Sequence, residues 1–356
     1  MSLLFSPLTI KNITLKNRIV VSPMCQYSAT DGFANNWHLV HLGTRAIGGA
    51  ALVIVEATGV SPEARISVGD LGIWKDEHIE KLKEITDFIH QNGAIAGIQL
   101  AHAGRKASFD IPWENPAQLD EANGGWQTVS ASAIPFNPTD KTPTALSLEG
   151  IEKVKADFKN ATVRAIKAGF KVIEIHAAHG YLQHQFLSPL SNHRDDNYGG
   201  SFENRIRLLL ETVEVVKEVW PRENPLFVRI SATDWADGGW NLDESVKLSA
   251  LLKEKGVDVI DTSSGGLTLA QQIPLVAGYQ VPFAEEIKKE TEVTTGAVGL
   301  ITSAKQAEEI LQSGKADLIF LARQLLRDPY FPLHAAAELN DDIKWASQYE
   351  RAKPRK

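Results

Sequence analysis

The sequence predicts an α/β chain that folds as a single (β/α)8 TIM barrel over residues 1–356. Short apolar runs of strand length alternate with longer amphipathic stretches along the whole chain. Parallel strands need long crossover connections, and eight strand–helix units close a barrel. The expected strands are 19–22, 51–55, 95–100, 171–176, 226–231, 259–262, 294–298 and 318–321.

The amphipathic stretches between these runs predict the helices of the outer ring. They are expected at 78–90, 148–168, 201–220, 243–255, 282–290 and 303–312. The helix from 201 has a suitable N-cap in Ser201, and Glu203 in its first turn suits the helix dipole.

Two segments depart from the strand–helix alternation. LTIKNITLKN, before the first strand, predicts a β-hairpin that turns at Lys11 and Asn12 and closes the N-terminal mouth of the barrel. The segment 101–143 is too long and too rich in Pro, Gly and Trp for an ordinary connection. Long loops in compact domains usually carry function, so we expect it to cap the site.

Composition excludes several classes of protein. The net charge of −7 and the lack of basic runs argue against nucleic acid or an anionic membrane as partner. No apolar stretch has the length of a membrane span, and the first residues lack the pattern of a signal peptide, so we expect a cytoplasmic protein. Cys25 is the only cysteine, which excludes an internal disulfide.

Polar residues gather where the expected strands end. Catalytic groups of TIM barrels lie at the C-terminal ends of the strands, so these positions are the candidate site. They are Cys25 and Tyr27, Glu56 to Thr58, Gln99 and His102, then His176, His179 and Tyr181, Arg229, and 263–266. Side chains from separate strands that meet in one place indicate an active site rather than core filling.

The last two units have the pattern of a phosphate site. The seventh strand continues into Gly296-Ala297-Val298-Gly299, and a helix follows from Ser303 with the spacing of a capping box. The eighth strand ends at Ala322 and Arg323. Small residues let backbone N–H groups approach an anion, and Arg binds phosphate through two nitrogens.

These residues leave more than one chemistry open. His176 and His179 have a spacing compatible with metal binding, and Glu56 or His102 could complete a zinc site. A metal-dependent TIM-barrel hydrolase is therefore an alternative, although it gives no role to Cys25 or Arg229. A non-catalytic phosphate-binding barrel is a more distant alternative.

Several segments, in this order, resemble the Old Yellow Enzyme family of FMN-dependent ene-reductases. They are SPMCQYSATDG, EATGVSPEARI, GIQLAHAGRKA, IHAAHGYLQHQFLSPLSNHRDDNYGGSFENR, TTGAVG, DLIFLARQLLRDP and QYER. The resemblance runs from Leu4 to Arg351 and is strongest to the thermophilic-like branch that includes xenobiotic reductases. It implies an NADPH dehydrogenase that reduces the C=C bond of α,β-unsaturated carbonyl and nitro compounds by a ping-pong hydride transfer.

The resemblance also implies a role for each candidate residue. Those that would contact non-covalent FMN are Ser22, Pro23, Met24, Cys25, Ala57, Gln99, Arg229, Gly299, Ala322 and Arg323. His176 and His179 would hold the substrate oxygen, Tyr27 would bind it from the other side, and Tyr181 would donate the proton. Ala322 departs from the Gly that commonly precedes the phosphate-binding Arg in this family.

The implied partners are small molecules and further copies of the chain. Enones, nitro compounds and quinones are the expected substrates, with xenobiotic detoxification as the expected role. Arg351 resembles the arginine that this branch contributes to the active site of a neighbouring subunit. We therefore expect a homodimer or homotetramer, with the segment 340–356 at its interface.

Overall fold

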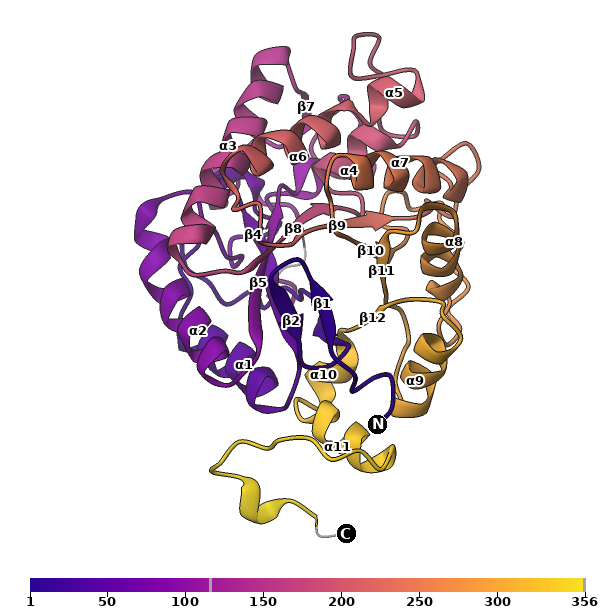
Figure 1. The fold of residues 1–356 in the computed structure, drawn as a ribbon. Coiled ribbons are helices and arrows are strands. Elements are labelled where there is room, and N and C mark those ends of the chain that lie inside the picture. Colours follow the sequence, from indigo (N-terminus) through magenta and orange to yellow (C-terminus); the bar gives the residue numbers. More distant parts are fainter. Residues whose placement is uncertain (115–116, 355–356) are drawn as a thin grey trace.

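Eight parallel strands form a closed barrel in the computed structural model, which describes residues 1–114 and 117–354 (Figure 1). Neighbouring strands follow one another in chain order around the barrel, and the last pairs with the first. The strands are β3 (Ile19–Val21), β4 (Leu52–Gly59), β5 (Ile95–Ala101), β8 (Val172–Ala177), β9 (Leu226–Ser231), β10 (Val259–Ser263), β11 (Thr294–Ala297) and β12 (Leu318–Leu321). The predicted fold class is confirmed.

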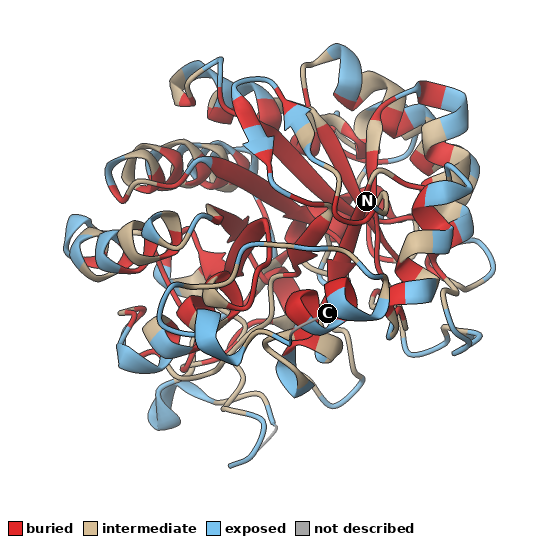
Figure 2. Cartoon of the chain, turned by 60° about the horizontal axis from the view of Figure 1, so that its bottom comes forward, coloured by how far each residue is buried: buried red, intermediate tan, exposed pale blue. Residues whose placement is uncertain are grey.

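Helices surround the barrel, with their outer faces exposed (Figure 2). The long ones are α1 (Asn36–Ile47), α2 (Ile79–Gln91), α3 (Leu148–Lys167), α6 (Arg207–Val219), α7 (Leu242–Glu254), α8 (Val281–Thr291), α9 (Ala304–Gln312) and α11 (Phe331–Glu338). The short ones are α4 (Leu182–Leu187), α5 (Phe202–Arg205) and α10 (Arg323–Arg327). The 3-10 turns are η1 (Pro62–Ala64), η2 (Asp76–His78), η3 (Gly104–Lys106), η4 (Glu121–Asn123) and η5 (Glu350–Ala352).

Two features of the helical ring differ from the prediction. The helices α1, α4, α10 and α11 were not predicted from the sequence. The single helix expected over 201–220 is divided at Ile206, whose ψ of −11° opens the backbone between α5 and α6. Ser201 caps α5 as expected, because its side chain accepts from the backbone N–H of Asn204.

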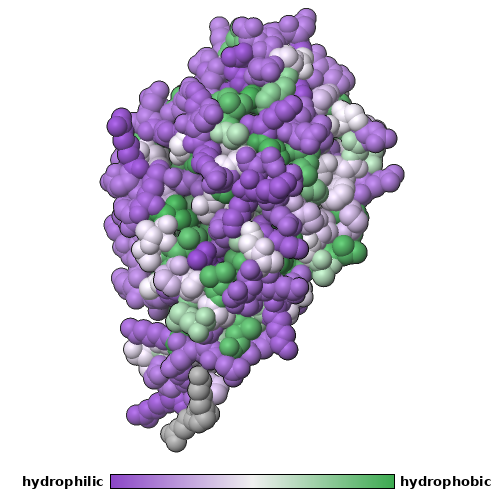
Figure 3. Space-filling view, turned by 45° about the vertical axis from the view of Figure 1, so that its right-hand side comes forward, coloured by the Kyte–Doolittle hydropathy of each residue, from purple (hydrophilic) through white to green (hydrophobic). Residues whose placement is uncertain are grey.

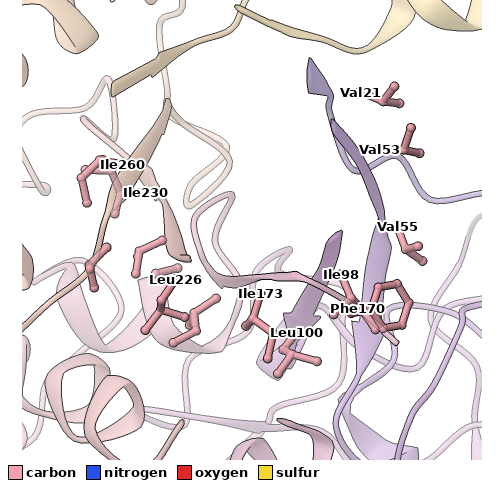
Figure 4. Packing of buried hydrophobic residues seen from close by; sticks show 14 of the residues in the cluster. Val21, Val53, Val55, Ile98, Leu100, Phe170, Ile173, Leu226, Ile230 and Ile260 are labelled. Atoms are coloured by element: carbon pink, nitrogen blue, oxygen red, sulfur yellow. The ribbon is translucent and has the colours of Figure 1, made fainter. Parts of the chain in front are cut away.

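Apolar side chains point both outward and inward from the strands. On the outer side, residues such as Val53, Val55 and Ile173 pack in the cluster beneath the helices (Figure 4). Inward-facing residues form a second cluster, Val20, Leu52, Ile54, Val172, Phe227, Val259, Val298, Leu318 and Phe320, with Ile10, Ile13 and Leu15 of the hairpin.

This shared inner cluster explains the role of the N-terminal hairpin. Its strands β1 (Leu8–Ile10) and β2 (Ile13–Leu15) are antiparallel, with Lys11 and Asn12 between them. The apolar side chains of the hairpin pack against the inner residues of the barrel strands, so the predicted plug is confirmed. Water is thereby excluded from the end of the barrel opposite to the candidate site.

The segment 101–143 contains little regular structure, and its residues 115–116 lie outside the described ones. Its short strand β6 (Val129–Ser130) pairs with β7 (Thr144–Ala145). Trp126 donates through its indole N–H to the carbonyl of Glu63, at 2.9 Å, which anchors the segment near the end of β4. That the segment caps the site, and that residues 1–356 form one domain, stay predictions.

The surface is mainly polar. On the face shown in Figure 3, hydrophilic residues predominate and apolar residues form separate patches. No helix in the described ranges has both the length and the apolar character that a membrane crossing requires.

We expect Gly296→Ala to lower the free energy of unfolding by about 1–3 kcal/mol, because the core would be overpacked. A Cβ at Gly296 would lie 2.2 Å from Cε2 of Phe320, whose ring occupies the barrel interior. Urea unfolding of the apoprotein measures the change. The matched control is the double variant with Phe320→Leu, which should cost less than the sum of the single changes. Strict additivity would contradict this account of the packing.

Candidate active site

A polar layer lies inside the barrel above the apolar inner cluster. Side chains on a strand alternate between its two faces, so the residue two positions after an inward apolar one also points inward. This rule places Ser22, Gln99, Glu174, Arg229 and Asp261 in the interior, each two positions after an inward residue. The register agrees, because Gln99 is paired with Glu174 and Arg229 with Asp261 on neighbouring strands.

The guanidinium of Arg229 is held from two sides. Its Nη1 donates to Ser22 Oγ at 3.1 Å, and its Nε lies 3.1 Å from Asp261 Oδ2. Gln99 is fixed separately, since its Nε2 donates to Glu174 Oε1 at 2.7 Å. Gln99 and Arg229 are 2% and 5% exposed. Two strong donors are thus preorganised at the floor of the site.

A β-bulge in β4 changes which residue faces the barrel. Val55 pairs with Ile98, but Ala57 rather than Glu56 pairs with Gln99. The bulge therefore brings Ala57 to the level of Gln99, while Glu56 contacts α1 and the segment after β3. A small residue beside Gln99 leaves room for a flat ligand.

Three rings converge at the end of β8. The ring centroid of His176 lies 5.1 Å from that of His179 and 5.0 Å from that of Tyr181. The rings of His179 and Tyr181 are 6.5 Å apart. The sequence prediction that these residues meet at one strand end is confirmed as geometry.

Hydrogen bonds determine which ring nitrogens remain for a ligand. The backbone N–H of Ala178 donates to Nδ1 of His176 at 3.3 Å, so a neutral His176 carries its proton on Nε2. In His179, Nε2 lies 2.7 Å from Ser263 Oγ, which leaves Nδ1 for a ligand. Each histidine therefore offers one ring nitrogen.

Burial sets the protonation state of these groups. It lowers the pKa of His176 and of His179 well below the ordinary value, and the positive charge of Arg229 adds to the effect. Burial raises the pKa of Tyr181 well above its ordinary value. At neutral pH the site therefore contains neutral imidazoles beside a protonated phenol.

The backbone at His179 is held in a left-handed conformation, with φ at 58°. This conformation is uncommon for a residue with a side chain. Two glycines permit the close packing around it: a Cβ at Gly266 would lie 2.7 Å from the backbone of His179, and a Cβ at Gly180 would lie 2.2 Å from the carbonyl oxygen of Gly266. The hydroxyl of Ser231 accepts from the N–H of His179 at 2.9 Å and helps to fix the turn.

The segment after β3 brings Cys25 and Tyr27 to the site. Pro23, Met24 and Cys25 are half-buried, and burial raises the pKa of Cys25 well above its ordinary value, so the thiol stays protonated. Tyr27 packs edge-on against Trp113 of the segment 101–143, with ring centroids 5.9 Å apart. Residues of that segment thus reach the mouth of the barrel.

Lys106 is a site residue that the sequence interpretation did not single out. Its Nζ donates to the carbonyl oxygens of His179 and Gly266, both at 2.8 Å, and lies 5.2 Å from the centroid of the Tyr181 ring. Burial lowers the pKa of Lys106 to about 8. It lies within GRKA, a motif used only for the family resemblance, and its position after a strand end was the available signal.

The predicted phosphate residues lie on the loops after β11 and β12. Gly299 has φ of 113°, and a Cβ there would lie 2.6 Å from Gln280 Nε2, so only glycine fits. Arg323 is exposed at the start of α10, and its guanidinium makes no hydrogen bond or ion pair with any residue that the structure describes. Ser303 caps α9 as expected, but Gln306 bonds to the N–H of Thr302 and does not complete a capping box.

The residues present fit FMN, the cofactor that the resemblance implies. Buried donors at Gln99 and Arg229 suit the polar edge of a flavin ring, and the small Ala57 leaves space beside them. Gly299 allows close backbone approach, and the guanidinium of Arg323 is available for a phosphate.

The alternative of a metal site lacks a third ligand. Oε1 of Glu56 lies 3.3 Å from His38 Nε2 and its Oε2 accepts from the N–H of Gln26, while Nδ1 of His102 accepts from the N–H of Gly104. In the described part of the chain, no three His, Cys, Asp or Glu residues are grouped as metal ligands. The hydrolase alternative is therefore not supported.

Arg351 lies in η5 within the C-terminal tail, which extends away from the barrel beyond α11 (Figure 1). Its side chain is exposed and makes no ion pair or hydrogen bond with other described residues. The structure does not bring it to the site of its own chain, whose other predicted residues lie at the barrel mouth.

Comparisons with known proteins show which family the chain matches. The model of the NADH:flavin oxidoreductase / NADH oxidase family matches residues 3–342. An NADPH dehydrogenase of Bacillus velezensis is 52% identical over 351 residues, 98% of this chain and of that protein. The solved structure of morphinone reductase has a TM-score of 0.80 and 27% sequence identity to this chain. The match covers 96% of this chain and 91% of morphinone reductase. The Old Yellow Enzyme homologue from Zymomonas mobilis has a TM-score of 0.79 at 26% identity, with 99% of both chains covered.

We expect Glu56→Gln to loosen the segment that carries Cys25. Each carboxyl oxygen of Glu56 faces one N–H group: Oε2 accepts from the backbone N–H of Gln26, and Oε1 lies beside Nε2 of His38. Nδ1 of His38 accepts from the N–H of Asn35, so the ring proton of a neutral His38 is on Nε2. Glutamine has one oxygen, so one buried donor loses its partner at a cost of about 1–3 kcal/mol. The rate of iodoacetamide alkylation of Cys25, the only cysteine, should rise.

Glu63→Gln is the matched control, since Glu63 forms a surface ion pair with Lys153. Equal alkylation rates in both variants and in the wild type would contradict the role assigned to Glu56.

Proposed function

The chain belongs to the NADH:flavin oxidoreductase / NADH oxidase family, and from this premise we propose that it is an NADPH-dependent ene-reductase with non-covalent FMN. The resemblance to Old Yellow Enzyme inferred from the motifs is confirmed, and the chain is an oxidoreductase of this type. The observation that carries the proposal is the convergence of His176, His179 and Tyr181 beside the buried Arg229.

We assign the cofactor contacts from the positions of the residues around the barrel mouth. The segment from Ser22 to Cys25 and Ala57 would line the ring, Gln99 and Arg229 would bind its pyrimidine edge, and Gly299, Ala322 and Arg323 would hold the phosphate. FMN held by these residues would supply the hydride chemistry of the reaction, with NADPH as reductant and the β-carbon of the substrate as acceptor.

The two histidines would polarise the substrate. Negative charge develops on the oxygen of an enone or nitro compound when hydride adds to the β-carbon. Nε2–H of His176 can donate to this oxygen. Nδ1–H of His179 can donate to it as well, in the tautomer in which Nε2 accepts from the Ser263 hydroxyl. Because both rings are neutral, the site binds carbonyl oxygens and phenols without a fixed positive charge at this point.

Tyr181 would supply the proton that completes the reduction. Its raised pKa keeps the phenol protonated until the α-carbon becomes basic. One hydride at the β-carbon and one proton at the α-carbon balance the reaction, and water then reprotonates the phenolate. The ammonium of Lys106, 5.2 Å from the ring centroid, would stabilise that phenolate.

The remaining assignments concern the assembly and its setting. We propose a homodimer or homotetramer in which the segment 340–356 lies at an interface and Arg351 reaches the active site of a neighbour. Residues 355–356 of this segment lie outside the described ones. We further propose a cytoplasmic enzyme that detoxifies electrophilic enones, nitro compounds and quinones.

A visible absorption spectrum of the purified protein tests the proposed function. We expect flavin bands that bleach on anaerobic addition of NADPH, and FMN in the supernatant after denaturation. A protein that stays colourless after incubation with FMN would contradict the proposal.

His176→Ala should abolish the spectral change caused by a phenol ligand and slow the oxidation of the reduced enzyme by an enone about 100-fold or more, because a donor to the developing charge is lost. Flavin content and the rate of reduction by NADPH should change little. Stopped-flow absorbance separates the two half-reactions. His193→Ala, at an exposed position, is the control, and an unchanged oxidative rate in His176→Ala would refute the assigned role.

Arg351→Ala should raise the KM for the enone with little change in flavin content, because Arg351 would act in the site of a neighbouring subunit. Steady-state kinetics measures the change, and size-exclusion chromatography of the same sample reports the assembly. Arg222→Ala, which removes an exposed arginine elsewhere, should leave KM unchanged. A monomeric wild type, or equal KM in all three proteins, would contradict this role.

A further inference from the structure

Two carboxyl groups lie inside the barrel in the same layer as Gln99 and Arg229, the residues assigned to the polar edge of the cofactor. Glu174 and Asp261 are both 0% exposed. Oε1 of Glu174 accepts from Gln99, but its Oε2 has no hydrogen-bond partner among the described residues. Neither oxygen of Asp261 has one, although Oδ2 forms an ion pair with Nε of Arg229. Three carboxyl oxygens therefore lack a donor.

The charges in this layer do not balance if both carboxyl groups are ionised. Arg229 is the cation whose charge favours the ionised form of both Glu174 and Asp261. His176, the next inward residue on β8, is neutral because burial lowers its pKa. Two carboxylates with one guanidinium would leave an uncompensated negative charge in the barrel. An uncompensated buried charge is strongly destabilising, and a shared proton avoids it.

We propose that Glu174 and Asp261 share one proton, carried by Glu174 and donated to Asp261, and that this pair positions Gln99 and Arg229 for the cofactor. The part about the cofactor rests on the proposed function, whereas the shared proton is a property of the protein alone. Both carboxyl groups fall outside the residues assigned to catalysis or binding above.

The hydrogen-bond directions around Glu174 follow from this assignment. Protonated Glu174 donates to Asp261 through Oε2, its one oxygen without a partner in the described part of the chain, since the two side chains are within hydrogen-bond reach of each other. It accepts through Oε1 from Nε2 of Gln99. The amide of Gln99 therefore keeps its carbonyl oxygen free as an acceptor for a ligand N–H. Asp261 remains the single carboxylate that pairs with Arg229.

The direction of the pKa shifts agrees with the geometry. Burial, and then the negative charge of Asp261, raises the pKa of Glu174 well above its ordinary value. Burial also raises the pKa of Asp261, while Arg229 and the hydrogen bond from Glu174 oppose the rise. Glu174 is therefore the member that keeps the proton at neutral pH.

Glu174→Gln is the decisive variant, because glutamine can replace every hydrogen bond of a protonated glutamic acid. Its amide N–H would donate to Asp261 and its oxygen would accept from Gln99. We expect the affinity of the apoprotein for FMN, measured by fluorescence quenching, to stay within about twofold of the wild type. Glu174→Ala and Asp261→Asn should weaken it about tenfold or more, since each leaves buried groups unpaired.

The pH dependence of apoprotein stability tests the shared proton without the cofactor. An acid whose pKa is raised in the folded protein contributes stability that is complete below its unfolded pKa of about 4.3 and is lost as the pH rises. The wild type should therefore lose stability relative to Glu174→Gln between pH 5 and pH 8. The ratio of the two unfolding constants should change by up to about tenfold per pH unit.

The possible results separate this inference from the proposed function. An unchanged stability difference across this pH range, or FMN binding as weak in Glu174→Gln as in Glu174→Ala, would overturn the inference. A wild type that fails to bind FMN would refute the proposed function, while the stability measurement would still test the pair.

A second measurement covers the case in which Glu174→Gln does not fold. The infrared spectrum of the folded wild-type protein at pH 8 should contain the carbonyl stretch of a protonated carboxylic acid that is absent in Asp261→Asn. Equal spectra of the two proteins in this region would overturn the proposal.

Discussion

The ion pair between Arg229 and Asp261 is the constraint on which the site depends. A guanidinium inside a barrel is costly unless its charge is compensated. Asp261 on the neighbouring strand supplies that compensating charge, Ser22 accepts a hydrogen bond from Nη1 of Arg229, and Glu174 and Gln99 extend the polar layer. The apolar cluster and the hairpin below this layer exclude water, which strengthens the electrostatic interactions above it.

Above this layer, the site offers hydrogen-bond donors from His176 and His179, and neither ring carries a charge. The positive Arg229 and burial together keep His176 and His179 neutral, so the two rings donate hydrogen bonds but do not hold a strongly bound anion. The left-handed turn at His179 depends on the close approach of Gly180 and Gly266. Electrostatics thus sets the charge of His176 and His179, and the backbone conformation sets the position of His179.

The strands and the meeting of His176, His179 and Tyr181 could be predicted from the sequence, because alternation and strand ends are local features. The bulge at Glu56 could not, since a strict period of two directs that side chain into the barrel. Glu174 was hidden within an apolar run, and its partner Asp261 lies 87 positions later by residue number, 261 − 174. The long-range contacts of Lys106 with His179 and Gly266 likewise leave no local pattern.

The most direct test of the account is a crystal structure of the protein with FMN. We predict the pyrimidine edge of the flavin within hydrogen-bond distance of Gln99 and Arg229, the phosphate at Gly299 and Arg323, and His176, His179 and Tyr181 over one face of the ring. A flavin bound away from Arg229, or a metal ion held by His176 and His179 in its place, would contradict the account.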